Sequence, residues 1–156
     1  MTKKTVLAAL AACLISATAV AATPDRAVGR LLDSLDFPYE VDEDGDYKMV
    51  FDAGDDRTQL VFVRSSVEKF GSHHVREIWS PAYRSATSSL PVGVANRLLE
   101  DSNDAKLGGW VRQQGTAMFV VKIDADAPAT ALGEAIEAAI RSADAMEEEL
   151  TGRDEF

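Results

Sequence analysis

The chain has 156 residues, enough for one domain of ordinary size. Its 26 acidic and 16 basic side chains give a formal net charge of −10, and such a surface repels nucleic acid and anionic lipid. The single cysteine, Cys13, excludes an intrachain disulfide framework and a cysteine-rich metal site.

The first 22 residues have the pattern of a secretory signal peptide. Lys3 and Lys4 form a basic start, residues 5–20 are almost entirely apolar, and small residues at 19–22 suit a signal peptidase. The apolar core is short for a membrane anchor, and no stop-transfer pattern follows it. We therefore expect export to the periplasm or the medium, with residues 23–156 as a single mature domain that does not insert stably into a membrane.

A lipoprotein is the alternative form of export. Residues 10–13 read Leu-Ala-Ala-Cys and resemble a lipobox, in which Cys13 would be acylated and become the new N-terminus. The apolar run continues to Val20, which favours soluble export. Cleavage near Ala22 leaves 14 basic and 26 acidic side chains, a formal charge of −12, and no cysteine.

The mature sequence begins with a predicted helix. Thr23 is expected to cap it and Pro24 to occupy its first position, and apolar residues at 28, 31, 32 and 35 form one stripe. Alternating apolar and polar residues then predict a hairpin over residues 39–51 around the acidic turn 42–46. We expect the sheet to grow from this hairpin.

Two further turns and two further strands follow. Polar residues at 52–57 and 68–74 predict the turns, and the continuous apolar run at 60–63 suits a central strand. Residues 75–83 predict another strand, in which Pro81 favours an edge position or a bulge.

The second half of the mature chain predicts two helices with a hairpin between them. Pro91 begins a helix that ends near residues 101–104, and a strand carrying Trp110 and Val111 turns at residues 114–115 into a strong apolar strand at 118–123. A long helix runs from near Pro128 to about residue 150. The order helix, three or four strands, helix, two strands, helix predicts an α+β fold, an antiparallel sheet of five to six strands with helices packed on it.

The acidic turns and the two histidines are the obvious candidate metal sites. If Gly45 takes the sixth position of a calcium loop, Phe51 falls at the twelfth, where a bidentate glutamate is needed, so we expect a solvated turn. His73 and His74 are adjacent, point to opposite faces of a strand, and have no further histidine or cysteine beside them in the mature chain. We predict no metal site.

Catalytic motifs are missing from the sequence. No serine near the histidines lies in a Gly-x-Ser-x-Gly motif, and Gly108-Gly109 lacks the later glycine and lysine of a phosphate-binding loop. We therefore predict no catalytic residue, no cofactor and no enzymatic activity.

Two aromatic residues are the candidate partner-binding residues. Trp79 and Tyr83 are typical of a core, which is one interpretation. If instead both lie on an exposed face near an edge strand, they would anchor a bound peptide, because aromatic residues dominate binding hot spots.

The order of elements and three stretches resemble the YbjN family of bacterial proteins. The stretches are residues 98–110 (Leu-Leu-Glu-Asp-Ser-Asn-Asp-Ala-Lys-Leu-Gly-Gly-Trp), 75–81 (Val-Arg-Glu-Ile-Trp-Ser-Pro) and 143–152 (Ala-Asp-Ala-Met-Glu-Glu-Glu-Leu-Thr-Gly). The first is the most specific, and the similarity covers essentially the whole of residues 23–156.

The resemblance implies a fold like that of type III secretion chaperones, compact α+β domains that often form dimers and bind extended segments of other proteins. Members of the family are described as sensory transduction regulators without a defined chemistry. The chaperones act in the cytoplasm, whereas this chain has an export signal. We therefore expect an exported, non-enzymatic module that binds an unknown protein or peptide and forms a homodimer. The alternative is an envelope protein that binds a small ligand or cation through the acidic turns at 42–46 and 52–56.

Overall fold

A computed structural model describes residues 23–156, and the expected signal peptide and Cys13 lie outside the described residues. The elements are α1 (Arg26–Ser34), β1 (Glu40–Val41), β2 (Tyr47–Gly54), β3 (Arg57–Phe70), β4 (His73–Arg84), α2 (Val92–Asp104), β5 (Gly109–Gln113), β6 (Thr116–Asp124) and α3 (Ala129–Thr151). The predicted α+β class and the order of elements are confirmed, with four strands between the first two helices.

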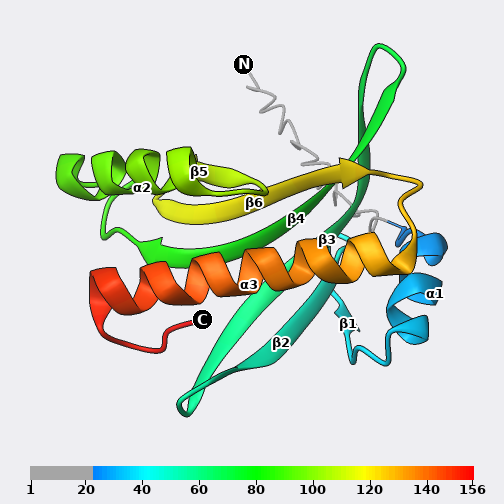
Figure 1. Ribbon diagram of the computed structural model, residues 1–156, viewed down its shortest axis with the longest axis horizontal. Helices are drawn as coiled ribbons and strands as arrows, with labels where there is room; N and C mark the ends of the chain where they lie inside the picture. The colour runs from blue at the N-terminus through cyan, green and yellow to red at the C-terminus, as the bar shows by residue number, and fades with distance from the viewer. Residues whose placement is uncertain (1–22) are drawn as a thin grey trace, which may run out of the picture.

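The six strands form one antiparallel sheet in the order β1-β2-β3-β4-β6-β5 (Figure 1). The expectation that the sheet grows from the first hairpin is wrong. β1 lies at the edge of the sheet and has only two residues, which pair with Tyr47 and Lys48 of β2. β3, β4 and β6 form the centre, since each of them lies between two longer strands, whereas one neighbour of β2 is the two-residue β1.

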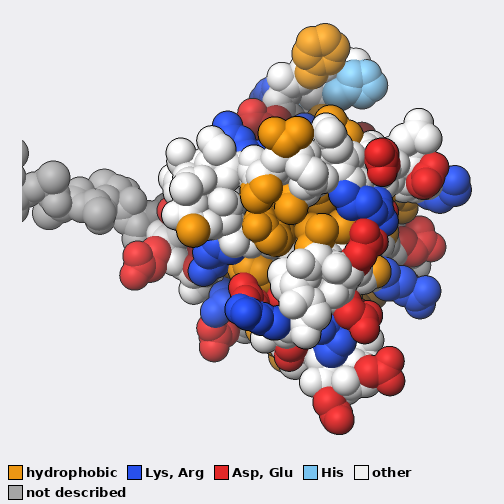
Figure 2. Space-filling view, turned by 90° about the vertical axis from the view of Figure 1, so that its left-hand side faces the viewer, with side chains coloured by type: hydrophobic (Ala, Val, Ile, Leu, Met, Phe, Trp, Pro, Cys, Tyr) orange, Lys and Arg blue, Asp and Glu red, His pale blue; other side chains and the backbone are white. Residues whose placement is uncertain are grey.

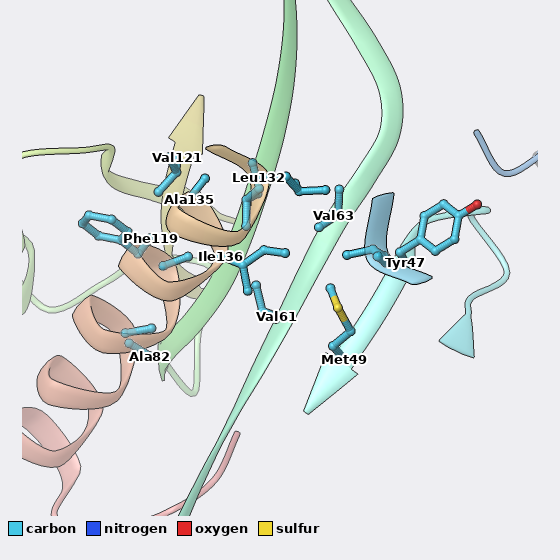
Figure 3. Packing of buried hydrophobic residues seen from close by; sticks show 14 of the residues in the cluster. Tyr47, Met49, Val61, Val63, Ala82, Phe119, Val121, Leu132, Ala135 and Ile136 are labelled. Atoms are coloured by element: carbon cyan, nitrogen blue, oxygen red, sulfur yellow. The ribbon is translucent and has the colours of Figure 1, made fainter. Parts of the chain in front are cut away.

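All three helices pack on the same face of the sheet. The largest, α3, crosses the strands in front of the sheet in Figure 1. Its stripe of buried residues includes Leu132, Ala135 and Ile136, which meet Val61 of β3 and Phe119 of β6 in one apolar cluster (Figure 3). Burial of this stripe, more than helix propensity, holds a helix of this kind on a sheet.

α1 begins later than the sequence predicts. Its N-cap is Asp25, whose carboxylate accepts the Ala27 N–H at 2.9 Å, so Thr23 and Pro24 lie outside the helix. Asp25 also forms an ion pair with Arg76, which is 5 % exposed, at 2.5 Å. That ion pair joins the start of α1 to β4.

Pro81 lies inside the sheet rather than at its edge. β4 pairs with β3 on one side and β6 on the other, and the β4–β6 register shifts between Pro81 and Tyr83. The expected bulge is present and the expected edge position is wrong. The missing N–H of Pro81 faces β3, where the β3–β4 pairing has ended at Phe62 and Trp79 and the Leu60 carbonyl accepts the Ser80 hydroxyl at 2.7 Å instead. The sheet therefore accommodates Pro81 in a central strand.

The strands run further into the predicted turns than the sequence indicates. β2 continues to Gly54, and the turn is formed by Asp55 and Asp56, both with positive φ. Likewise, β3 continues to Phe70, and β4 begins at His73. Polar residues can pair at the ends of strands, so a prediction from composition alone makes these two turns longer than they are.

Candidate functional site

A cavity of about 550 Å³ opens between the outer part of β2 and α3. Its lining combines aromatic and aliphatic side chains with a charged rim, and consists of Phe37, Phe51, Asp52, Ala53, Gly133, Ile136, Glu137, Ile140, Arg141 and Asp144. We call this cavity the β2–α3 groove. Its volume lies within the range that proteins use for ligands, about 300–1,000 Å³.

The apolar wall of the groove follows from the alternation of β2. Tyr47, Met49 and Phe51 point to the helix-covered face, but only the first two are buried. The ring of Phe51 instead meets Phe37 edge to face, with centroids 5.0 Å apart. Phe51 and the half-buried Ile140 therefore leave apolar surface accessible beside the strand.

Three carboxylates and one guanidinium border the groove. Glu137 and Arg141 form an ion pair at 2.5 Å on the exposed side of α3. Asp144 is bound by Arg57 at 2.7 Å. Asp52 accepts the Gly54 N–H at 2.8 Å, and no ion pair to Asp52 is found within residues 23–156. The rim is therefore acidic, with Asp52 its least compensated charge.

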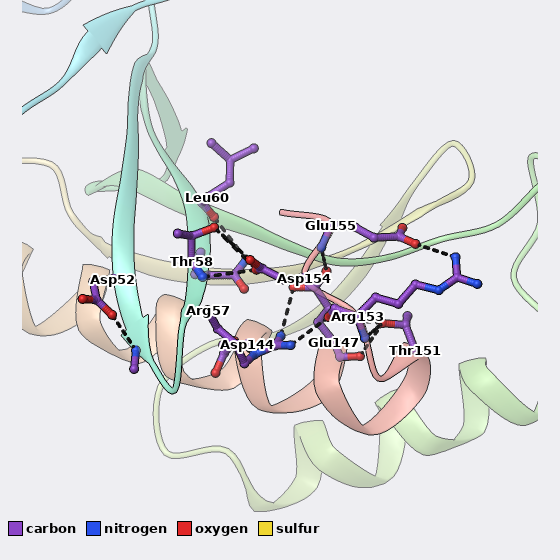
Figure 4. Close-up of polar contacts among 12 residues, drawn as sticks. Asp52, Arg57, Thr58, Leu60, Asp144, Glu147, Thr151, Arg153, Asp154 and Glu155 are labelled. Carbon is purple, nitrogen blue, oxygen red and sulfur yellow. Dashed lines mark hydrogen bonds and ion pairs between the residues drawn. The ribbon is translucent and has the colours of Figure 1, made fainter.

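A polar network fastens the end of the groove to the C-terminal segment (Figure 4). Arg57, at the start of β3, binds Asp144 and reaches the fully buried Glu147 at 3.4 Å. Glu147 also accepts the Glu155 N–H at 2.7 Å. Burial raises the pKa of Glu147, and the Glu155 N–H and Arg57 oppose that effect. The network holds structure together and leaves no buried carboxylate open to a substrate.

The edge of β2 beside the groove lacks a strand partner in the described part of the chain. β1 covers Tyr47 and Lys48, and β3 pairs with the other side of β2. The Asp42 N–H donates to the Asp46 carbonyl at 3.0 Å, so position 46 bonds toward β1. Backbone groups alternate in direction along an antiparallel strand, so Val50 and Asp52 direct their N–H and C=O groups outward.

The predicted binding residues Trp79 and Tyr83 do not form a common surface. Trp79 is half-buried on the face without helices, where its indole N–H donates to Glu77 at 2.9 Å and Arg64 lies 5.2 Å from its ring. Tyr83 follows the bulge, pairs with Ala117 and packs against the core under the helices. Both belong to a central strand, so the expected edge location is wrong.

Two of the four carboxylates in the acidic turn at 42–46, those of Asp42 and Asp46, bind groups of the protein itself. Asp42 accepts the N–H groups of Asp44 and Asp46 at 3.0 and 2.9 Å. Asp46 is ion-paired with Arg64 and accepts the Ser65 N–H at 2.7 Å. The bonds of Asp42 are those of an ordinary Asx turn, and those of Asp46 join the turn to β3, so both carboxylates have a structural role.

His73 and His74 lie exposed at the tip of the β3–β4 hairpin. Within residues 23–156, no group of three or more His, Cys, Asp or Glu side chains is arranged to hold a metal ion. None of the helices in this range is long and apolar enough to cross a membrane.

Other exposed apolar residues include a group on α2 and β5, where Leu99 and Val111 border one hollow together with Leu90 and Trp110. Seen from the left-hand side of Figure 1, hydrophobic side chains gather at the centre of the molecule and charged groups surround them (Figure 2). The large exposed hydrophobic residues are Val41, Val50, Phe70, Val92, Leu99, Leu107 and Val111. Val50 alone of these adjoins both the free part of β2 and the groove-lining residues Phe51 and Asp52.

Sequence reasoning recognised the groove residues only as core residues. The alternation along β2 puts Phe51 on the face of Tyr47 and Met49, and Ile136 and Ile140 share the apolar stripe of α3, a pattern that is typical of core residues. The signal that could have indicated a site is the short partner strand, because two residues of β1 cannot cover eight residues of β2. No protein-family model matches the chain, and no curated protein matches it.

Proposed function

We propose that the protein is an exported, non-enzymatic binding module that takes up an extended segment of another protein as an additional strand on β2. The observation that carries the proposal is the uncovered edge of β2, from Met49 to Gly54, directly beside the apolar β2–α3 groove. An edge and a pocket together are what strand addition requires: the edge binds backbone, and the pocket takes alternate side chains.

Backbone hydrogen bonds supply the first half of recognition. The N–H and C=O groups of Val50 and Asp52 point away from β3 and continue the line on which β1 pairs with Lys48. A segment laid along this edge forms a regular ladder with them.

Side chains supply the second half. Every other residue of the added strand points to the helix-covered face, the face of Phe51 and Ala53, and so enters the groove. There it contacts Phe37 and Ile140 and loses apolar surface to water, which favours binding by roughly 25 cal/mol per Å².

The resemblance to the YbjN family points in the same direction. It is carried by residues 75–81, 98–110 and 143–152, and it implies a fold like that of type III secretion chaperones and a partner bound in extended form. Under this proposal the chain shares with those chaperones the binding of extended segments and the formation of a homodimer, and differs in acting outside the cytoplasm.

A small apolar ligand in the β2–α3 groove is the second candidate, favoured by the cavity of about 550 Å³. Such a ligand would perturb Phe37 and Ile140 and leave the outward N–H groups of Val50 and Asp52 unchanged. The cation alternative has less support, since Asp42 and Asp46 already bind backbone N–H groups and Arg64. Melting with millimolar calcium tests it, and we expect no change in the midpoint.

The test of strand addition is an NMR titration of residues 23–156 with a decapeptide of alternating valine and threonine. We expect the amide signals of Val50 and Asp52 to shift together with those of Phe51 and Ile140. N-methylation of the peptide, one residue at a time, should weaken binding about tenfold at alternate positions only, because alternate N–H groups face β2. If millimolar peptide leaves the amide signals of residues 49–54 unmoved, the proposal is wrong.

A pair of variants locates the side-chain contacts. Ile140→Asp places a charge in the groove and should abolish peptide binding. Leu150→Asp changes another half-buried residue of α3 that does not line the groove, and should retain binding once its own effect on stability has been measured. Equal loss of binding in both would place the contacts elsewhere.

Export is tested by the mass of the protein recovered from a periplasmic extract. Cleavage by signal peptidase predicts a chain that begins at Thr23. A chain that begins at an acylated Cys13 and stays with the membrane would establish the lipoprotein alternative instead.

A further inference from the structure

We infer that the segment added to β2 carries a lysine or arginine opposite Asp52, between two apolar residues. This inference rests on the proposed strand addition and names the chemical class of the partner: an extended segment in which apolar residues alternate with a basic one.

The faces of β2 set the pattern. Residues directly opposite each other in an antiparallel pair project to the same face of the sheet. Asp52 and Val50 project to the face without helices, and Phe51 and Ala53 project toward the groove. A ligand residue opposite Asp52 therefore lies beside its carboxylate, and the residues before and after it enter the groove.

The charge of the site determines that the ligand residue opposite Asp52 is positively charged. One carboxylate oxygen of Asp52, Oδ1, accepts the Gly54 N–H, and Oδ2 has no hydrogen-bond partner within the described chain. No lysine or arginine within residues 23–156 forms an ion pair with Asp52, and the cations on the helix-covered side, Arg141 and Arg57, are bound to Glu137 and Asp144. A ligand cation therefore meets an unneutralised carboxylate, on a mature domain with a formal charge of −12.

The groove selects the flanking residues. Its walls are the rings of Phe37 and Phe51 and the side chains of Ile136 and Ile140, which offer no hydrogen bonds. A polar side chain placed there would lose its hydration without a partner, whereas a valine or leucine gains from burial. Val50 is 54 % exposed and favours an apolar residue two positions from the basic one, on the same face of the sheet, the face without helices.

The test uses three fluorescein-labelled decapeptides that differ only at one position, where lysine, glutamine or glutamate stands between two valines in a threonine host. For the unaltered domain we expect affinity to fall from lysine to glutamine to glutamate by about two- to fivefold per step. The differences should shrink in 0.5 M NaCl, because salt screens charges at a sheet edge.

The charge reversal Asp52→Lys should invert the order, so that the glutamate peptide binds best. Asp52→Asn keeps the oxygen that accepts the Gly54 N–H and should bring the three affinities together. The control is Asp104→Lys, the same charge change on the exposed end of α2, which should preserve the original order.

The outcomes separate this inference from the proposed function. Binding of all three peptides with the same affinity, or in the same order to Asp52→Lys as to the unaltered domain, would overturn the inference and leave strand addition standing. If none of the peptides binds, while the alternating valine–threonine decapeptide also leaves β2 unperturbed, strand addition itself fails.

Discussion

At the scale of single residues, Gly108 shows why the Gly-Gly pair of the 98–110 stretch is needed. Its φ is +80°, and a Cβ there would lie 2.5 Å from the Val120 carbonyl oxygen. The chain turns at this point from α2 into β5 against the backbone of β6. Only a residue without a side chain allows that approach, so the fold requires glycine at position 108.

Gly108→Ala should lower the free energy of unfolding by at least about 2 kcal/mol, since the left-handed conformation and the contact with Val120 both oppose a methyl group. Gly93→Ala is the control: nothing lies within 4 Å of the added atom, and alanine in α2 should stabilise by about 0.5–1 kcal/mol. Urea unfolding measures both. If the two substitutions change the free energy of unfolding equally, the close approach of Gly108 to the Val120 carbonyl does not require a glycine.

Arg57 is expected to contribute more to stability than any other cation on the rim of the groove. Arg57→Ala leaves the buried Glu147 without its ion pair and should cost about 3–5 kcal/mol in urea unfolding. Adding Glu147→Gln should recover part of that loss. Arg141→Ala removes an ion pair whose side chains are 78 % and 59 % exposed, and should change stability by no more than about 0.5 kcal/mol.

Asp25 makes stability depend on pH. Burial by itself would raise its pKa, but the Ala27 N–H and Arg76 outweigh burial and lower the pKa below 3.8. The carboxylate therefore stabilises the fold above pH 3.8, and this stabilisation is lost as the pH falls through the lowered pKa. Asp25→Asn should be less stable by about 2 kcal/mol at pH 7 and equally stable in strong acid. A difference that is constant with pH would contradict this assignment.

At the scale of elements, the shortness of β1 is what leaves β2 available. A partner strand of two residues pairs with Tyr47 and Lys48 and then gives way to the chain that leads back to α1. Exposed edges invite pairing with other chains, and proteins ordinarily protect them. Here the uncovered part is short, contains Asp52 and is followed by Asp55 and Asp56, and these acids limit indiscriminate pairing.

Val50→Pro tests the edge as an element. Its N–H points outward, so proline removes a donor that the fold does not use, and a proline at such a position is tolerated in an edge strand. We expect the melting temperature to change by only a few degrees and the valine–threonine decapeptide to bind at least about tenfold more weakly. Val50→Ala keeps the N–H and should bind within about threefold of the unaltered domain. Full binding by the proline variant would exclude a ladder at this edge.

At the scale of the whole molecule, stability should be graded across the sheet. β4 lies between β3 and β6 and under α3, whereas the outer part of β2 has one strand partner. Native-state hydrogen exchange should therefore be slowest at Val61, Ile78 and Val121, with opening energies near the global value, and fast at Val50 and Asp52. Slow exchange at Val50 in the absence of peptide would show that the edge is already covered.

The sequence by itself determined the α+β class and the order of helices and strands, with three or four strands left open before the second helix, because hydrophobic periodicity is a local property that burial on one face imposes. Strand order, the central position of β4 and the opposite faces of Trp79 and Tyr83 were decided only by the tertiary structure. They depend on pairings between distant residues and on a bulge at Pro81 that shifts the alternation of faces. The β2–α3 groove likewise depends on the tertiary structure. It lies between α3 and the part of β2 that the short β1 leaves uncovered.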